Sequence, residues 1–195
     1  LTGENRTLAY FGLKRLNEAP RKGLGSIIRI CGLDKHIITI DDIVFKIGPR
    51  INAAGRMRVD PDDPDAAPSG GHKAVEMLIE RDEAMAKECS KSIDEFNQSR
   101  KSIDRNVTQE AHDIIENNPE MKSHKSIVIY NPKWMKGIVG IVASRLIETY
   151  YKPTVVLTMS NNFATGSARS VTGFDLYQAV ESCSDLLENF GGHMY

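Results

Sequence analysis

Residues 73–118 read KAVEMLIERDEAMAKECSKSIDEFNQSRKSIDRNVTQEAHDIIENN, a stretch of 46 residues without glycine or proline. Its apolar side chains recur mostly at steps of three and four, the spacing of one face of an α-helix. They are Val75, Leu78, Ile79, Ala86, Cys89, Ile93, Phe96, Ile103, Val107, Ala111 and Ile114. The stretch predicts one long helix, which at 1.5 Å per residue would reach roughly 70 Å. Such a helix is either part of a coiled coil or a strut between two globular bodies.

Two features of the stretch favour the strut. Asp82 and Arg100 fall on the line of the apolar positions, which is a poor seam for a coiled coil. Residues 59–118 also carry seven Lys/Arg against fifteen Asp/Glu, a balance of −8. That charge suits a spacer better than a surface that contacts DNA, because it repels phosphates.

Composition predicts a globular protein of one large or two small domains, with 41% hydrophobic and 26% charged residues among 195. No apolar run is long enough to span a membrane, and no signal-peptide pattern opens the chain, so we expect no membrane partner. Three scattered cysteines without a CxxC pair indicate a reducing, cytoplasmic setting. The chain begins with Leu1 and stops shortly after Gly191-Gly192-His193, so we expect a piece of a longer protein.

Residues 1–58 carry eleven Lys/Arg against five Asp/Glu, a balance of +6. This excess fits either the footprint of a phosphate or nucleic-acid ligand or a solvated basic face. The region predicts short helices and no sheet of its own. These are a helix over 8–16 that is broken by Gly12 or ends near Pro20, a helix over 24–30 ended by Gly32, and a helix that follows a Thr39–Asp42 capping box and stops at Gly48-Pro49.

The segment at 48–56, Gly-Pro-Arg-Ile-Asn-Ala-Ala-Gly-Arg, sets Arg50 and Arg56 among small residues. Small residues allow a ligand to approach the backbone closely, and arginine suits paired hydrogen bonds to phosphate. A plain turn with two solvated arginines is the alternative. The acidic stretch 59–72 that follows lacks the spacing of a calcium loop, so we expect an exposed connector.

The last third predicts a strand over 126–130, a helix over 138–148 and a second strand over 154–158. Strand, helix and strand within this length indicate a βαβ unit with parallel strands and a right-handed crossover. Lys133 and Lys136 stand in the turn before that helix, where the helix dipole favours an anion. A further helix is expected from about Phe174 to Asn189, after a turn at Asn161-Asn162.

Two short motifs in this third are candidate phosphate ligands. Ser167, Arg169 and Ser170 lie in a segment of small and hydroxyl residues that could cradle a phosphate. Gly191-Gly192-His193 could bring backbone N–H groups and an imidazole to the same ligand. Taken singly, the first motif is more often a turn, and the second is often only a helix end.

The order of the motifs is more specific than any one of them. Gly-Pro-Arg-Ile-Asn-Ala-Ala-Gly-Arg, the long helix, Trp-x-Lys-Gly-Ile-Val-Gly-Ile-Val-Ala-Ser-Arg-Leu at 134–146, Gly-Ser-x-Arg-Ser and Gly-Gly-His follow one another. This order resembles the RecJ family of single-stranded-DNA-specific exonucleases in the DHH/DHHA1 phosphoesterase superfamily, over essentially the whole chain. The resemblance implies an α/β fold with four parts: the C-terminal part of a DHH catalytic domain (1–58), an acidic connector (59–72), a long interdomain helix (73–118) and a truncated DHHA1 domain with a small, mainly parallel sheet (119–195).

The resemblance also implies a function. The intact protein would degrade single-stranded DNA from its 5′ end in recombination and repair, with Mn²⁺ or Mg²⁺ bound at Asp and His residues. The family's Asp-His-His triplet is missing here, so we expect neither a metal nor a catalytic residue in this chain, and no nuclease activity. The candidate phosphate-contacting residues are Arg50, Arg56, Ser167, Arg169, Ser170, Gly191, Gly192 and His193.

Further expectations from the resemblance concern partners and departures. Single-stranded DNA, single-stranded-DNA-binding protein and a RecQ-type helicase are the expected partners of a monomer, and the family's OB domain would lie beyond Tyr195. Met135 stands where the family commonly has His, which leaves open any role for an imidazole there. The alternatives are a DHH/DHHA1 phosphodiesterase for oligonucleotides or cyclic dinucleotides, and a non-catalytic coiled-coil adaptor that dimerises through 73–118.

Overall fold

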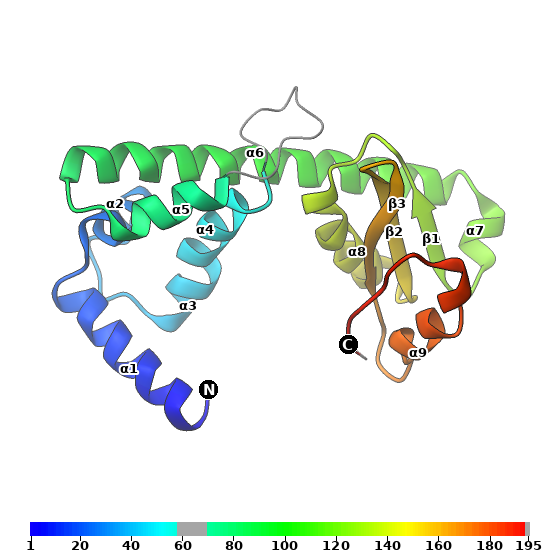
Figure 1. The fold of residues 1–195 in the computed structure, drawn as a ribbon, viewed down its shortest axis with the longest axis horizontal. Helices are drawn as coiled ribbons and strands as arrows, with labels where there is room; N and C mark the ends of the chain where they lie inside the picture. The colour runs from blue at the N-terminus through cyan, green and yellow to red at the C-terminus, as the bar shows by residue number, and fades with distance from the viewer. Residues whose placement is uncertain (58–69, 194–195) are drawn as a thin grey trace. The chain divides into compact units, whose positions relative to one another are not determined.

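The computed structural model of the chain describes residues 1–57 and 70–193. The chain divides into two compact units, Leu1–Arg100 and Lys101–Tyr195. The division falls inside helix α6, Glu83–Glu116, which contributes apolar side chains to the hydrophobic cluster of each unit (Figure 1). The helix predicted as a separate connector is therefore part of both cores.

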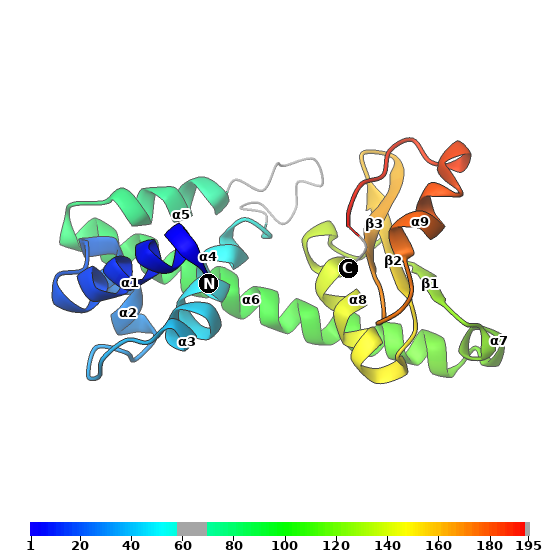
Figure 2. The same ribbon diagram turned by 90° about the horizontal axis from the view of Figure 1, so that it is seen from below.

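The prediction of a single helix over 73–118 is wrong, because the chain turns at residues 80–82. Helix α5 spans Gly70–Ile79, and after α6 a short helix α7 spans Pro119–Ser123. At the turn, a carboxylate oxygen of Glu80 accepts the backbone N–H groups of Arg81 (2.6 Å) and Asp82 (2.8 Å). Asp82 then accepts the N–H of Met85 at 2.9 Å, as an N-cap residue does. As a result α5 lies alongside the first part of α6 (Figures 1 and 2).

The apolar stripe of the two helices is confirmed in most places and shifted by one or two residues in others. Ile115 is buried where Ile114 was expected, and Met77 is buried whereas Ile79 is 63% exposed. Four predicted positions lie fully inside the cores: Ala86, Ile93, Val107 and Ala111. On α6 the stripe is thus mostly covered by the chain itself, unlike an exposed coiled-coil seam, whereas Val75 and Ile79 on α5 are exposed.

The first unit is helical, as predicted. Its helices before α5 are α1 (Gly3–Glu18), α2 (Lys22–Ile30), α3 (Ile40–Asp42), the π-helical turn η1 (Ile43–Ile47) and α4 (Gly48–Ala54). The cluster of buried side chains that joins them consists of Ile27, Ile28, Leu33, Ile38, Ile47, Ala54, Ala74, Met77 and Ile93.

One expected helix end is confirmed and another does not occur. Helix α1 continues through Gly12 and ends at Glu18, near Pro20, as one of the two alternatives predicted, whereas Gly48-Pro49 opens α4 instead of ending a helix. In η1 the N–H of Gly48 bonds to the carbonyl of Ile43, five residues back. This wider turn accommodates the ring of Pro49, which in a regular helix would collide with the carbonyl four residues earlier. The predicted end of α2 is confirmed, since Gly32 follows it with a φ of 69°.

The capping box at Thr39 and Asp42 is confirmed. The Asp42 carboxylate accepts the N–H of Thr39 at 3.0 Å and an N–H of the Lys46 ammonium at 2.7 Å, while Thr39 Oγ1 accepts the N–H of Asp42 at 3.3 Å. The Lys46 ammonium first, and the Thr39 N–H next, hold the pKa of Asp42 well below its usual range. The box therefore stabilises the folded state through the charged form of this carboxyl.

Changing Asp42 to Asn should make the free energy of unfolding depend less on pH in the acid range. A lowered folded pKa stabilises the protein above the unfolded pKa of about 4, and this contribution is lost as the pH falls toward the folded value. Wild-type protein should therefore lose more stability between about pH 7 and about pH 3 than Asp42→Asn does. Urea midpoints over this range measure the difference, and Asp41→Asn at the exposed neighbouring position is the control. Parallel profiles for wild type and Asp42→Asn would refute the assignment.

The second unit contains a mixed α/β layer. Its elements are β1 (Ile127–Tyr130), α8 (Lys136–Tyr150), β2 (Thr154–Ser160) and β3 (Phe163–Arg169). The described residues form a sheet in the order β1-β2-β3, with β1 and β2 parallel and β2 and β3 antiparallel. This confirms the βαβ unit and the α/β class. The sheet has one parallel and one antiparallel pair of strands.

Strand β3 was not predicted, because its residues were interpreted as a phosphate-binding loop. Asn161 and Asn162 have φ values of 51° and 62°, and they form the two-residue turn that joins β2 to β3. Positive φ at both positions is typical of a tight hairpin. Two asparagines after an apolar strand were the sequence signal for this hairpin.

One ion pair fixes α8 to the second part of α6. Arg145 donates from Nε to Asp104 Oδ1 at 2.9 Å and from Nη2 to Asp104 Oδ2 at 2.8 Å. The Asp104 side chain is only 2% exposed, and its hydrogen bonds raise the pKa of Arg145. In the same unit, Trp134 is buried and donates to Glu110 at 2.8 Å, while Met135 packs against the core.

The helix predicted over 174–189 is shorter than expected. Helix α9 spans Leu176–Glu181, and a single 3₁₀ turn, η2, spans Ser184–Leu186. Leu186 is 80% exposed, so packing contributes little to a longer helix here. In Figure 2, α8 and α9 lie on opposite sides of the sheet. Within the described residues, no helix combines the length and apolarity needed to cross a membrane.

Candidate nucleic-acid interface

The Arg169 guanidinium at the end of β3 is held by three acceptors. Its Nη1 donates to Ser167 Oγ at 2.9 Å and to the Ala168 carbonyl at 2.7 Å. Its Nε donates to Ser144 Oγ, on α8, at 3.2 Å. Ser167 and Arg169 are two residues apart, and therefore their side chains point to the same face of β3. The structure thus brings together two residues predicted to contact phosphate, and it leaves the arginine exposed to solvent.

Ser170 does not join this cluster as a donor. Its hydroxyl donates to the Phe174 carbonyl at 2.6 Å, which helps to close the turn between β3 and α9. A hydroxyl has one hydrogen to donate. The proposed DNA-contacting set therefore does not include Ser170 as a phosphate donor.

Arg50 is engaged in internal contacts. It lies on α4, and its Nε donates to Asp94 Oδ1 at 2.7 Å while its Nη1 donates to the Lys46 carbonyl at 2.8 Å. Its side chain is only 16% exposed. Arg56 follows α4 in an exposed turn of the same unit. Arg50 thus connects α4 to α6 and is left out of the proposed contact set.

Gly191, Gly192 and His193 are exposed at the end of the described chain. In Figures 1 and 2 the segment that leads to the C-terminus runs beside β3 and α8. The glycine pair therefore lies in the same unit as Ser167 and Arg169. Binding of phosphate by Gly191, Gly192 and His193 stays a prediction.

The turn before α8 keeps both of its predicted basic residues exposed. Lys133 and Lys136 flank buried Trp134, and the side chain of Asn131 accepts the backbone N–H of Lys133 at 3.0 Å. This asparagine fixes the turn that leads into α8. Anion binding at this helix end also stays a prediction.

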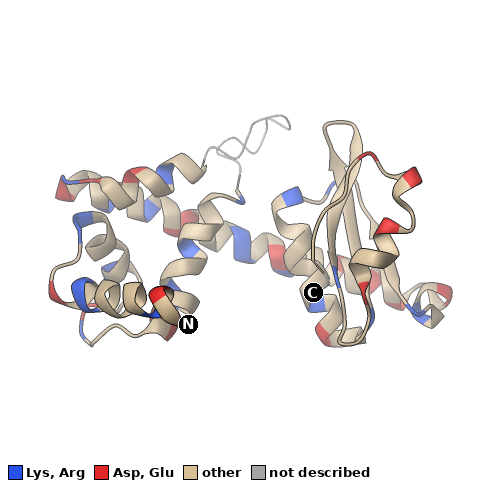
Figure 3. Ribbon diagram, turned by 60° about the horizontal axis from the view of Figure 1, so that its bottom comes forward, with Lys and Arg blue, Asp and Glu red and all other residues tan. Residues whose placement is uncertain are grey.

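Part of the basic charge of the first unit is paired with acidic side chains of the same unit. Lys22 and Arg29 lie 3.2 and 3.4 Å from the Glu83 carboxylate at the start of α6. Arg50 pairs with Asp94 further along the same helix. The ribbon in Figure 3, coloured by residue type, shows acidic positions interspersed with basic ones on these helices. The predicted basic excess is thus in part a set of internal ion pairs.

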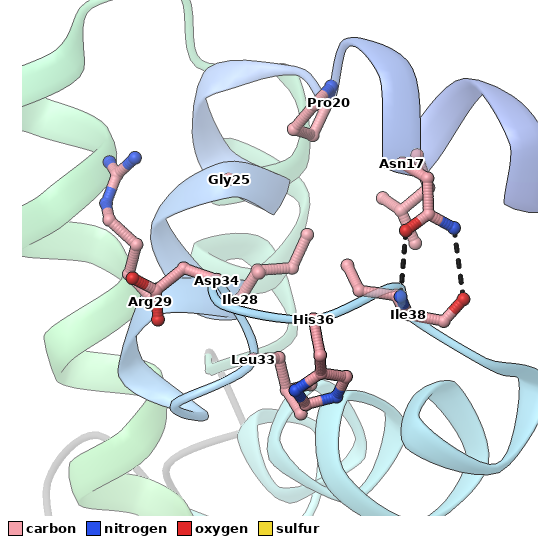
Figure 4. Close-up of a pocket in the computed structure, with 10 residues that line it drawn as sticks. Asn17, Pro20, Gly25, Ile28, Arg29, Leu33, Asp34, His36 and Ile38 are labelled. Carbon is pink, nitrogen blue, oxygen red and sulfur yellow. Dashed lines mark hydrogen bonds between the residues drawn. The ribbon is translucent and has the colours of Figure 1, made fainter.

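An open pocket of about 210 Å³ lies in the first unit (Figure 4). On one wall the Asn17 side-chain amide donates to the Ile38 carbonyl at 3.0 Å and accepts the Ile38 N–H at 2.8 Å. On another wall lies Arg29, which is paired with Glu83. These polar groups join α1 and α2 to their neighbours, so the pocket lies where these helices pack against the rest of the unit.

The described residues do not fit a metal centre. Across residues 1–57 and 70–193, no three side chains of His, Cys, Asp or Glu gather in a metal-binding arrangement. Of the predicted acidic connector at 59–72, residues 59–69 lie outside the described residues, and residues 70–72 are not a connector but open α5.

Two residues of the cluster were not singled out from the sequence. Gly140 and Ser144 belong to the motif at 134–146, but only the antiparallel pairing of β3 places them beside Arg169. Their spacing of four residues on one helix was the signal that they share a face. Without β3 in the prediction, that face had no known neighbour.

Comparison with known proteins gives a family match within the second unit. The DHHA1 domain family matches residues 123–195. The single-stranded-DNA-specific exonuclease RecJ of Bacillus subtilis is 35% identical over 99% of this chain, and that of Haemophilus influenzae is 32% identical over 99%. These matches span 23% and 33% of those relatives, so the chain corresponds to about a quarter to a third of their length.

Solved structures agree with this assignment. RecJ of Thermus thermophilus in complex with Mn²⁺ superposes with a TM-score of 0.79 at 28% identity, covering 98% of this chain and 26% of that one. The same protein in complex with Mg²⁺ gives a TM-score of 0.78 at 27% identity, with 98% and 27% coverage. Residues 123–195 therefore match the DHHA1 domain family, and the chain as a whole is similar to one segment of the RecJ exonucleases.

Proposed function

We propose that this chain is the single-strand-holding segment of a RecJ-type 5′→3′ exonuclease of DNA recombination and repair. The observation that carries the proposal is the exposed Arg169 guanidinium, fixed by Ser167 and Ser144 in a domain matched to the DHHA1 family. An exposed, oriented guanidinium beside a hydroxyl suits a phosphodiester oxygen, because both groups can donate hydrogen bonds to it.

Hydrolysis is assigned to residues outside this chain. The relatives crystallised with Mg²⁺ or Mn²⁺ are about four times as long as the matched segment, and the described residues here offer no metal ligand set. In such enzymes the metal activates water against a phosphodiester. The side chains of this segment would instead bind and orient the strand.

Two alternatives are less well supported. A phosphodiesterase for short oligonucleotides or cyclic dinucleotides would share the DHHA1 domain, but the relatives named above are RecJ proteins matched over 99% of the chain. A coiled-coil adaptor would need an exposed seam on α6, and that stripe is buried inside the chain. Association with single-stranded-DNA-binding protein or a RecQ-type helicase, a monomeric state and a cytoplasmic location stay predictions.

Changing Arg169 to Ala should weaken the binding of a fluorescent oligo-dT by about tenfold, because one fixed phosphate contact is lost. The slope of log K against log salt concentration should become shallower by about 0.7, the value for one phosphate on a single strand. Fluorescence anisotropy over a salt series measures both quantities. Arg105→Ala, which removes an equal charge from an exposed position on α6, is the control. Equal losses of affinity for the two variants would mean that Arg169 contributes only its positive charge, and would contradict the proposal.

A further inference from the structure

We propose that Gly140 and Ser144 are positioning residues, which hold the Arg169 guanidinium in the orientation that binds a phosphate. Both lie on the face of α8 that packs against β3, four residues apart. This inference rests on the proposed function, since it assigns a role to two residues that act through Arg169.

Ser144 presents an oriented acceptor to the arginine. Its hydroxyl donates to the Gly140 carbonyl at 3.1 Å, one turn earlier on α8, and accepts the Arg169 Nε hydrogen at 3.2 Å. Because the single hydroxyl hydrogen is bonded to the helix, a lone pair of the oxygen is directed away from that carbonyl. A freely rotating hydroxyl would not favour one direction in this way. The helix therefore fixes the direction of the Nε bond.

Gly140 makes room for this arrangement. A Cβ at position 140 would lie 3.1 Å from Ser167 Oγ and 3.3 Å from Arg169 Nη2, closer than such atoms ordinarily pack. The glycine thus lets the Ser167 and Arg169 side chains lie directly against the surface of α8. Glycine in a helix interior lowers helix stability relative to alanine, so a close approach of this kind gives it a physical reason.

Together the contacts select which part of the guanidinium can meet a ligand. Its hydrogen bonds within the described chain use Nε and both hydrogens of Nη1. Nη2 is then the nitrogen whose two N–H groups can meet a phosphate oxygen. An exposed arginine would otherwise sample many rotamers, and fixing one of them before binding reduces the conformational entropy lost when the strand is bound.

A double-mutant cycle between Ser144 and Arg169 tests the inference. Ser144→Ala should weaken oligo-dT binding by about threefold, because one hydrogen bond that orients the guanidinium is removed. In a background of Arg169→Ala, the same change should have no further effect, because nothing remains to be oriented. A merely structural effect of Ser144→Ala would instead appear equally in both backgrounds.

Thr149→Val is the matched control. Thr149 also lies on α8 and donates to a carbonyl four residues back, at 3.3 Å, and the hydrogen bonds of Arg169 do not involve it. Thr149→Val should leave DNA binding unchanged. If Thr149→Val weakens binding as much as Ser144→Ala does, the effect belongs to the helix, and the positioning role is excluded.

Gly140→Ala supplies a second, independent variant. It should weaken binding by a larger factor in the wild-type background than in Arg169→Ala, where only the contact with Ser167 remains, whereas Gly12→Ala, whose added methyl group meets no atom within 4 Å, should change neither. Additive losses for Ser144→Ala and Arg169→Ala would overturn the positioning role. Unchanged binding by Arg169→Ala itself would overturn the proposed function, and the positioning role with it, so the two failures are distinguishable.

Discussion

Replacing Arg145 by Met is expected to lower the free energy of unfolding by about 3 kcal/mol, because it removes both hydrogen bonds from a guanidinium to a buried carboxylate. Asp104 is only 2% exposed on its side chain, and both of its oxygens accept hydrogen bonds from Arg145. The Thr108 hydroxyl also lies 3.4 Å from Asp104 Oδ1. Urea denaturation followed by circular dichroism measures the loss.

Replacing Asp104 by Asn should lower the free energy of unfolding less than replacing Arg145 by Met does. Arg145 is 47% exposed, so after Asp104→Asn its guanidinium can be hydrated where it stands. The double variant should also be more stable than the two separate losses predict, because the two residues interact directly. Equal losses for Arg145→Met and Asp104→Asn, or additive ones, would show that the pair does not fasten α8 to α6.

Replacing Gly23 by Ala is expected to lower the free energy of unfolding by about 3 kcal/mol, at the upper end of overpacking effects. A Cβ at position 23 would lie 1.6 Å from the carbonyl oxygen of Met77, so α2 and α5 could not keep their present approach. Neither backbone can yield as a flexible side chain would. The loss therefore reports directly on the packing of α5 against α2, which the turn at 80–82 makes possible.

Gly25→Ala, two residues further along α2, is the matched control. There the added methyl group would meet only side-chain atoms, at 3.7 Å or more. Since alanine favours the helix more than glycine does, this variant should gain up to about 1 kcal/mol. Chemical denaturation of both variants gives the comparison, and a loss at Gly25 as large as that at Gly23 would contradict the packing argument.

Local signals in the sequence predicted many elements correctly. The Thr39–Asp42 capping box, the end of α2 at Gly32 and the βαβ unit depend on residues near one another in the chain, and all three are confirmed. The long-helix prediction was wrong because periodicity continues across a turn. Asp82 interrupts the apolar line as an N-cap, and no glycine or proline marks the place.

The candidate site was predictable only in part, because it depends on pairing between distant segments. Ser167 and Arg169 form a local motif that the sequence predicted. Ser144 lies beside Arg169 only because β3 packs against α8. Arg50 shows the reverse case. Its motif predicted a phosphate ligand, but the position of Asp94 on α6, 44 residues further along the chain, makes it an internal ion pair.

We propose that this chain holds single-stranded DNA without cleaving it. The most direct measurement incubates residues 1–195 with a 5′-labelled oligo-dT and Mn²⁺, and follows anisotropy and released nucleotides in the same sample. We expect salt-sensitive binding that depends on Arg169, with the oligomer intact. Metal-dependent release of nucleotides by this chain, or binding that is unchanged in Arg169→Ala, would contradict it.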